Sequence, residues 1–345
     1  MKALLKHVID ITCQRDHALL DNSVVLALHN LVGAPQVRVY EMFRFRGELF
    51  ALARTWIENG KIVSIQDMHI SEHAGETIDK YPLLAESIMK HKTCAEELTP
   101  GGDRILWLPI WLNDNVSACI EVVNPTPYGS DTLFMIEGIL SVYRNCRSIL
   151  DYSERDSLTG LLNRKTFDEK FSRLLSASTL NGAPQDREER RHHNAACIGQ
   201  WLAVVDIDHF KRVNDQFGHL YGDEVLILVA NLLRSSFRSQ DRVFRFGGEE
   251  FVVLLRSTTL EQARQIFERF RISVEQHNFP QVGKVTVSLG FAGISNESPV
   301  VILGHADQAL YYAKANGRNR ICHYDELVSA GKLRSEVSND VVEFF

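Results

Sequence analysis

Four acidic residues stand at two breaks in the apolar stretches of this chain, and their spacing could support metal-dependent chemistry. Asp206 and Asp208 follow one apolar run, and Glu249 and Glu250 follow a pair of glycines between two others. Asp206 and Asp208 share a strand face, because side chains alternate along a strand. Two carboxylates with a backbone carbonyl suit a hard cation such as Mg²⁺ beside substrate phosphates. The alternatives are an ordinary polar turn after the glycines and an Asx turn at Asp206.

Two predicted elements must position these acids. Apolar residues flank Gly247-Gly248 on both sides, which predicts a β-hairpin whose glycines bend sharply and can approach a ligand. The apolar run Trp201–Val205 predicts a buried strand that ends in Asp206. A carboxylate in that position is costly to desolvate unless it is paired or bound to a metal. We expect the strand and the hairpin to be neighbours, with Asp206 beside Glu249.

The rest of the second half predicts alternating helices and strands. Helices are expected at 165–176, 221–237, 260–276 and 301–315, and strands at 284–294 and 320–323. With the buried strand and the hairpin, they give helices interspersed with strands on a mostly antiparallel core, which is typical of an α+β fold. The polar stretch 177–199 contains His192-His193 without a framework of cysteines or carboxylates around the pair, so we interpret it as a solvated or disordered insertion.

The first half predicts a second α+β domain and a long helix. Two helical patterns occupy 1–33 and a short one 82–92, and strands are expected at 37–45, 49–57, 61–64, 104–112 and 116–123. Residues 131–155 place apolar residues about 3.5 residues apart, a spacing that suits helix packing. This helix could close the core of its own domain or continue as a two-chain stalk, and both can hold at once.

Composition excludes several classes of protein. The 345 residues are enough for two domains, and the formal net charge of −6 argues against a general binder of nucleic acid or anionic membranes. The sequence contains no apolar stretch of transmembrane length and no signal-peptide pattern at its start. The six cysteines are scattered, so we expect reduced, mostly buried thiols in a cytoplasmic protein, and no structural zinc.

Several motifs of the second half, in order along the chain, resemble the GGDEF family. They are Asp156-Ser-Leu-Thr-Gly-Leu-Leu-Asn-Arg164, Asp206-Ile-Asp-His-Phe-Lys-x-x-Asn-Asp215, Gly218-His-x-x-Gly-Asp223, Gly247-Gly-Glu-Glu-Phe251 and Tyr312-Ala-Lys-x-x-Gly-Arg-Asn319. The resemblance covers residues 153–325. It implies a palm-like α+β domain and a diguanylate cyclase, which condenses two GTP into cyclic di-GMP and releases two pyrophosphates.

The resemblance also implies roles for individual residues. Asp206, the Ile207 carbonyl and Glu249 would hold Mg²⁺, with Mn²⁺ as the alternative, and Glu250 would be a second-metal ligand or proton acceptor. The residues assigned to GTP are Phe210, Lys211, Asn214, His219, Asp223, Gly247, Gly248, Lys314 and Arg318. Asn214 and Asp223 would bind the guanine edge, and an aspartate at 223 favours GTP over a mixed product. A helix-terminal acid at 223 and dipole-complementing cations at 314 and 318 are the structural alternatives.

Regulation and assembly follow from the same resemblance. Arg238-Ser-Gln-Asp241 matches the inhibitory RxxD site that binds cyclic di-GMP in the family, and Arg269 stands where a further product-binding arginine often lies. A surface ion pair is the alternative. Each domain would hold one GTP, so ring closure would require a homodimer. A catalytically idle domain that binds GTP or cyclic di-GMP is the alternative function, but the acids of the signature are intact.

The element order of the first half resembles a GAF sensory domain, with a PAS-like sensor as the near alternative. The segment Asn124-Pro-Thr-Pro127 lacks the lysine and phenylalanine of the cyclic-nucleotide-binding GAF motif, so we do not expect that ligand. The expected organisation is therefore a GAF-like sensory or dimerisation domain (1–130), a helical stalk (131–155), a GGDEF domain (156–325) and a C-terminal tail (326–345). We expect neither nucleic-acid binding nor membrane insertion.

Overall fold

The computed structural model describes residues 2–45, 47–58, 60–65, 75–112, 114–180, 198–238, 241–295 and 297–333. The chain divides into two compact units, Met1–Ser153 (unit 1) and Glu154–Phe345 (unit 2). Most of the predicted insertion at 177–199 and the end of the predicted tail lie outside the described residues. Within the described part of the chain, no helix is long and apolar enough to cross a membrane.

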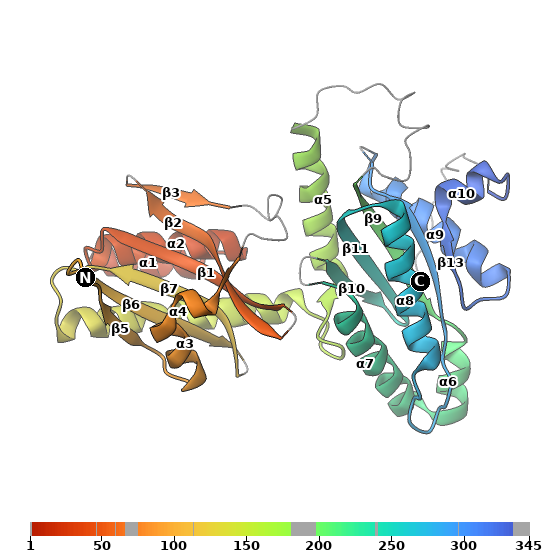
Figure 1. The fold of residues 1–345 in the computed structure, drawn as a ribbon, viewed down its shortest axis with the longest axis horizontal. Helices are drawn as coiled ribbons and strands as arrows, with labels where there is room; N and C mark the ends of the chain where they lie inside the picture. Colours follow the sequence, from red (N-terminus) through yellow and green to blue (C-terminus); the bar gives the residue numbers. More distant parts are fainter. Residues whose placement is uncertain are drawn as a thin grey trace. The chain divides into compact units, whose positions relative to one another are not determined.

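Unit 1 is an α+β domain on one antiparallel sheet, with strand order β3-β2-β1-β7-β6-β5 and β4 paired to β2 (Figure 1). Its strands are β1 (Gln36–Phe45), β2 (Glu48–Glu58), β3 (Lys61–Ser64), β4 (Glu76–Thr77), β5 (Ala95–Leu98), β6 (Arg104–Leu112) and β7 (Asn115–Val123). Its helices are α1 (Lys2–Thr12), α2 (His17–Leu31), the 3₁₀ turn η2 (Ile78–Lys80), α3 (Pro82–Met89) and α4 (Ser130–Glu154).

The two faces of this sheet are covered by different helices. Side chains of α2 and α4 pack with one face of β1, β6 and β7, whereas Leu84 of α3 packs with the other face. Tyr143 of α4 is fully buried, but Phe134 and Ile149 of the same helix are 79% and 65% exposed. Helix α4 therefore closes the core of unit 1 and still leaves apolar side chains at its surface.

A buried polar network joins α2 to α4. The Tyr143 hydroxyl donates a hydrogen bond of 2.6 Å to Asp21 Oδ1, and the Arg147 guanidinium lies 3.1 Å from the same oxygen. All three side chains lie within the core at less than a tenth exposed. A buried charge that loses its partner is strongly destabilising, so this network fixes how α4 packs on α2.

Unit 2 is built on a six-stranded mixed sheet of order β13-β12-β9-β11-β10-β8 (Figure 1). Its strands are β8 (Leu162–Asn163), β9 (Gly199–Ile207), β10 (Arg242–Gly247), β11 (Glu250–Thr258), β12 (Val287–Gly293) and β13 (Ile321–His323). Its helices are α5 (Arg164–Leu180), α6 (Phe210–Phe217), α7 (His219–Ser236), α8 (Leu260–Gln276), α9 (Pro299–Ala315) and α10 (Tyr324–Ser329). The β8–β10 and β12–β13 pairs are parallel, and the other pairs are antiparallel.

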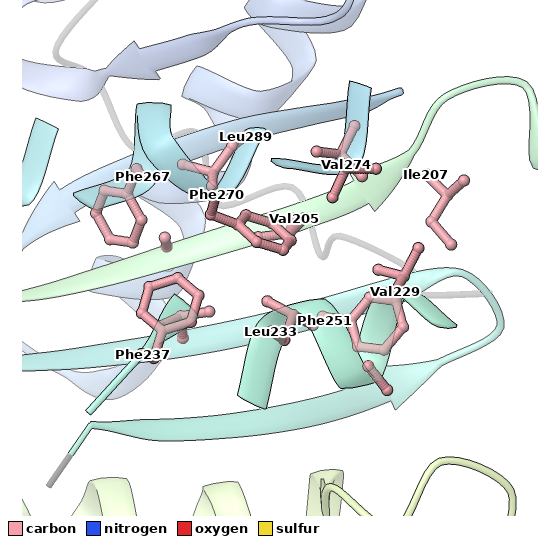
Figure 2. Close-up of a cluster of buried hydrophobic side chains, with 14 of the residues drawn as sticks. Val205, Ile207, Val229, Leu233, Phe237, Phe251, Phe267, Phe270, Val274 and Leu289 are labelled. Atoms are coloured by element: carbon pink, nitrogen blue, oxygen red, sulfur yellow. The ribbon is translucent and has the colours of Figure 1, made fainter. Parts of the chain in front are cut away.

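Alternation along β9 and β11 divides the core of unit 2 into two layers. Figure 2 shows one layer, in which Val205 and Phe251 of the sheet meet Leu233 of α7 and Phe267 and Phe270 of α8. The other layer lies under α5, α9 and α10. The strands between the layers are buried on both faces, so they form a rigid support for the polar residues at their ends.

Four local expectations differ from the structure. Strand β5 was not expected, because its sequence Ala-Glu-Glu-Leu is polar and short. Residues 210–217, for which no helix is predicted, form α6, which buries Phe210 and Val213. The thiols of Cys13 and Cys94 are exposed rather than buried. Helix α10 also overlaps the expected tail, and its Leu327 is 8% exposed.

Candidate active site

The pairing of β9 with β11 brings the predicted acids together. Asp206 and Glu250 are directly opposite each other in the antiparallel register. The Ile207 N–H also donates a hydrogen bond of 3.4 Å to the Glu249 carbonyl. The hairpin turns at Gly247 and Gly248, whose φ angles of 152° and 50° are unfavourable for other residues. Glycine at these positions therefore lets the hairpin present two consecutive acids beside the end of β9.

The carboxylates are crowded and largely withdrawn from water. Asp206 is 4% exposed, and Glu249 and Glu250 are half-buried. Burial raises the pKa of Asp206, and the Lys314 charge only partly offsets it. Burial also raises the pKa values of Glu249 and Glu250, with a further contribution from the negative charge of Asp206. Desolvation and mutual repulsion of these carboxylates therefore cost free energy in the folded state, and a bound cation would reduce that cost.

Cationic residues approach the cluster from the C-terminal end of α9. Lys314 Nζ lies 2.8 Å from Asp206 Oδ2, and the charge of Arg318 lowers the Asp206 pKa. Gly290 of β12 lets α9 pack this close, because an added Cβ would lie 2.1 Å from the Leu310 nitrogen. Arg318 lies beyond the helix, with a φ of 60°. The predicted helix 301–315 ends at the same residue as α9, so only Lys314 of the two predicted cations is helical.

The cluster is suited to a hard divalent cation held partly by non-protein oxygens. No group of three or more His, Cys, Asp or Glu side chains in the described ranges is arranged to hold a metal by itself. Asp206, Glu249 and the Ile207 carbonyl meet at adjoining strand ends. Oxygen donors with an excess of negative charge fit Mg²⁺ or Mn²⁺ better than softer metals, and substrate phosphates or water would complete the coordination.

The predicted guanine-binding residues lie where α6 meets α7. Asn214 of α6 packs against Gly222 of α7, where an added Cβ would lie 2.0 Å from Asn214 Oδ1. Asp223 follows Gly222 and is exposed, and His219 is exposed in the first turn of α7. An exposed acceptor beside an amide is a suitable surface for the N–H edge of a guanine.

The other predicted phosphate contacts lie at the start of α6. The Phe210 side chain is buried, so only its backbone can serve a ligand. Lys211 is exposed and borders an open surface depression of about 460 Å³. His209, just before the helix, has a left-handed φ of 59°. The start of α6 thus presents backbone N–H groups and one exposed lysine, which suits an anion.

Residues 153–320 match the protein family model described as "Diguanylate cyclase, GGDEF domain". This part of the chain is a GGDEF domain.

Proteins with such domains are similar to this chain over about half of its length. The GGDEF-containing region is 43% identical over 170 residues to diguanylate cyclase DgcP of Pseudomonas aeruginosa, covering 48% of this chain and 23% of that protein. It is 37% identical over 196 residues to diguanylate cyclase DgcM of Escherichia coli, covering 56% of this chain and 44% of that protein. The solved coiled coil and GGDEF domain of DgcB from Caulobacter crescentus, in complex with c-di-GMP, is 28% identical, with a TM-score of 0.46 over 56% of this chain and 96% of that chain.

The chain spans less than half of the length of either curated relative.

The beginning of the GGDEF domain is tied to its hairpin by an ion pair. Arg245 of β10 lies 2.9 Å from Asp156 Oδ1 and also donates a hydrogen bond of 2.9 Å to the Gly248 carbonyl. Burial raises the pKa of Asp156, but hydrogen bonds from Thr159 and Arg245 outweigh it and lower the pKa overall. This contact connects the first residues of the domain directly to the turn that presents Glu249.

The predicted inhibitory residues gather at the end of α7. Asp241 is buried, and its carboxylate accepts hydrogen bonds from the backbone N–H groups of Arg238 and Arg256 at 3.0 and 3.3 Å. Arg269 of α8 donates a hydrogen bond of 2.7 Å to the Ser236 carbonyl. Arg238 and Arg269 therefore lie at one corner of the domain, where Asp241 fixes the loop. Residues 239 and 240 of the motif lie outside the described part of the chain.

Two groups of residues near the site were missed from the sequence. Asp307 of α9 is half-buried. Its negative charge helps to raise the pKa of Glu250, although burial and the charge of Asp206 contribute more. Its spacing of seven residues from Lys314 was the available signal, since i and i+7 share a helix face. Asp208 was noticed, but its hydrogen bonds with Thr286, Ser288 and Asn319 were not expected, because these residues are distant from it in the sequence.

Proposed function

We propose that the chain is a diguanylate cyclase that condenses two GTP into cyclic di-GMP and releases two pyrophosphates. The observation that carries the proposal is the cluster of Asp206, Glu249 and Glu250 on adjoining strand ends, faced by Lys314. Its carboxylates outnumber its contacting cations, and it belongs to a GGDEF domain with diguanylate cyclases among its relatives. A negatively charged cluster beside cationic residues is the arrangement that a metal–triphosphate substrate requires.

Asp206, the Ile207 carbonyl and Glu249 would hold Mg²⁺, or alternatively Mn²⁺. The bound cation would activate the attacking ribose 3′-oxygen and neutralise charge on the leaving pyrophosphate. Glu250 is placed opposite Asp206 and would either join a second cation or accept the proton of the 3′-hydroxyl. Lys314 and Arg318 would neutralise the triphosphate, so that binding orients it for in-line attack.

The base and the remaining phosphates would be held at α6, α7 and the hairpin. Asn214 and Asp223 would hydrogen-bond the guanine edge, and an aspartate there prefers the N1–H and N2–H₂ donors of guanine over adenine. Phe210 through its backbone, with Lys211 and His219, would contact the phosphates or ribose. Gly247 and Gly248 would leave room for the nucleotide. The selectivity for GTP would therefore come from Asp223 rather than from the metal site.

Ring closure would require a second copy of the chain, because each domain would hold one GTP and present one 3′-hydroxyl. Helix α4 supports this proposal, since it leads to Glu154 and leaves Phe134 and Ile149 exposed. We propose that unit 1 is a GAF-like sensory or dimerisation domain, with residues 131–155 as the stalk. A variant that remains monomeric by light scattering at assay concentration and keeps full activity would contradict this assembly.

The experiment that tests the proposed function is incubation of the full chain with GTP and Mg²⁺, followed by chromatographic separation of the nucleotides. Cyclic di-GMP and pyrophosphate in a 1:2 ratio are expected. GTP binding without any cyclic product would instead support the alternative, a catalytically idle binding domain. ATP in place of GTP is the matched control, and it should give no cyclic dinucleotide.

Product inhibition at Arg238, Asp241 and Arg269 is a separate part of the proposal. Arginine side chains read the guanine O6 and N7 atoms and pair with phosphate, so the two arginines at one corner could bind cyclic di-GMP. Arg238→Ala should raise both the accumulated product and its inhibition constant. Arg264→Ala, which removes an arginine of the exposed ion pair with Glu326, is the control and should change neither. Unchanged inhibition in Arg238→Ala would exclude this site.

A further inference from the structure

Asp208 is the member of the Asp-x-Asp pair whose carboxylate already accepts hydrogen bonds from three protein donors. It lies just beyond β9 and is 5% exposed. Its oxygens accept hydrogen bonds from the hydroxyls of Thr286 and Ser288, each at 2.7 Å, and from the Asn319 backbone N–H at 3.0 Å. A buried carboxylate with three such donors is well compensated. Asp208 therefore has a different task from Asp206, which faces Lys314.

That task concerns the turn that follows α9. Gly317, Arg318 and Asn319 have φ angles of 108°, 60° and 47°. Consecutive left-handed residues are unfavourable when they carry a Cβ, so the surrounding structure must hold them. The Arg318 N–H donates to the Ala313 carbonyl at 3.0 Å, which secures the side of the turn next to α9. Asp208 secures the other side through the Asn319 N–H.

The side chain of Asn319 extends this support to α8. Its Oδ1 accepts a hydrogen bond of 2.7 Å from Arg271, and its Nδ2 donates one of 2.7 Å to Glu275. Arg271 is itself 9% exposed and is fixed by Glu268 and Glu275 at 2.7 and 2.9 Å. Every polar group of the Asn319 amide is thus matched to a held partner, so the turn is connected to two elements outside α9.

We propose that Asp208, Asn319 and Arg271 are positioning residues, whose hydrogen bonds hold the left-handed turn and so fix where Arg318 meets the substrate triphosphate. The inference rests on the proposed function, because it assigns Arg318 to the triphosphate of GTP. None of the three residues needs to touch the nucleotide. They affect GTP binding through Arg318, so the proposal can be tested by the energetic coupling between their substitutions and Arg318→Ala.

The primary variant is Asn319→Ala, which keeps the backbone N–H but removes both side-chain bonds and disfavours the left-handed φ. Loss of a charged hydrogen bond should raise the KM for GTP about 10-fold, with kcat changed less than about 2-fold. Asn319→Gly should lie between the wild type and Asn319→Ala, because glycine accepts the left-handed conformation. Arg271→Ala should resemble Asn319→Ala, whereas Arg264→Ala on the same helix should leave KM unchanged.

A double-mutant cycle separates positioning from general damage to the fold. In an Arg318→Ala background, Asn319→Ala should raise KM by less than about 2-fold, because the residue through which it acts is gone. Equal effects of Asn319→Ala in both backgrounds would overturn the proposal. So would a loss of kcat at constant KM, or an Asn319→Gly variant no better than Asn319→Ala. Thermal unfolding of each variant checks that the domain remains folded.

The same cycle read by equilibrium binding of α,β-methylene-GTP with Mg²⁺ distinguishes this inference from the proposed function. If the wild-type chain makes no cyclic di-GMP, but Asn319→Ala and Arg318→Ala are coupled in analogue binding, the proposed function is rejected and the positioning role is supported. If the wild-type chain forms product, but the two substitutions are not coupled, the positioning role is rejected and the proposed function is supported. Absence of both product and analogue binding would overturn the two together.

Discussion

Both units of this protein bury carboxylates, but they balance the negative charge differently. In unit 1, Asp21 meets the Arg147 guanidinium at 3.1 Å and the Tyr143 hydroxyl at 2.6 Å. In unit 2, Asp206, Glu249 and Glu250 adjoin one another, and Lys314 is the lysine within 4 Å of Asp206. Burial raises the pKa of Asp21 and of the three acids alike. Desolvation is therefore common to both regions, and only the balance of charge differs.

The difference separates a structural role from a binding role. A buried acid with its own arginine and hydroxyl partners is complete, and it joins two helices. A group of acids with too few cations is incomplete, and its free energy falls when a cation enters. Substitutions in the two regions should therefore have opposite consequences for stability and for activity.

The largest effect is expected in unit 1. Arg147→Met leaves Asp21 buried without its cation, so the free energy of unfolding of unit 1 should fall by about 3–5 kcal/mol. Urea unfolding followed by tryptophan fluorescence measures it, because Trp56, Trp107 and Trp111 lie in unit 1 and only Trp201 lies in unit 2. The double variant Asp21→Asn/Arg147→Met should lose less than Arg147→Met alone.

A surface pair provides the control for that prediction. Lys90 and Glu86 form an exposed i, i+4 pair on unit 1, so Lys90→Met should leave the unfolding midpoint unchanged. A midpoint for Arg147→Met equal to that of Lys90→Met would show that the Asp21 network does not hold α4.

The second effect reverses the pattern in unit 2. Glu249→Gln removes one of the crowded acids, so we expect kcat for cyclic di-GMP to fall by roughly 10²–10³-fold, as for loss of a preorganised electrostatic contact. The free energy of unfolding should stay the same or rise, because like-charge repulsion and desolvation are relieved. Product assays and urea unfolding on one preparation measure both. A large loss of stability in Glu249→Gln would erase the distinction between the two regions.

Two glycines test which contacts of unit 2 are structural and which serve the ligand. Gly290→Ala places a Cβ 2.1 Å from the backbone nitrogen of Leu310, so it should destabilise the domain by about 1–3 kcal/mol. Gly222→Ala meets the end of the Asn214 side chain, which can move aside, and approaches the Phe210 ring at 3.3 Å, so stability should change less than in Gly290→Ala. Its KM for GTP should rise about 10-fold through the lost guanine contact. An unchanged KM for GTP in Gly222→Ala would exclude Asn214 from the binding site.

Sequence patterns predicted the elements that depend on local signals. The glycine hairpin and the β9 run are recognisable because apolar alternation and Gly-Gly lie within a few residues. Helix α6 was missed because its sequence is polar, and it is stabilised by burying Phe210 and Val213 against other elements. The proximity of Asp206 to the Glu249 turn could be predicted because both strands are recognisable from their own apolar sequences.

Contacts between distant residues could not be predicted in the same way. The Asp208–Asn319 hydrogen bond joins residues separated by 111 positions, and nothing local to either indicates the other. The end of α9 at Ala315 agrees with the predicted helix 301–315, but the left-handed turn that carries Arg318 was not predicted, since it depends on how the residues after the helix pack. Residue types therefore indicated the chemistry, whereas the supports that position it depend on tertiary packing.

The smallest effect is a difference in pH dependence between the wild type and Glu249→Gln. Burial raises the folded pKa of Glu249 above its ordinary value of 4.5. Its contribution to stability is therefore fully present below pH 4.5 and is lost as the pH rises through the raised pKa. Over that interval the free energy of unfolding should fall more steeply with pH in the wild type than in Glu249→Gln. Asp21 is present in both proteins and changes their free energy of unfolding with pH in the same direction, so its contribution cancels in the difference.

Magnesium should reduce this difference, because a bound cation favours the ionised carboxylates and so lowers their pKa values. Urea unfolding at a series of pH values above 4.5, with and without Mg²⁺, measures the two slopes. Parallel slopes without Mg²⁺ would mean that folding does not raise the pKa of Glu249, which would contradict a surplus of carboxylates in unit 2. A steeper wild-type slope that Mg²⁺ abolishes would place the cation at the acids that distinguish unit 2 from unit 1.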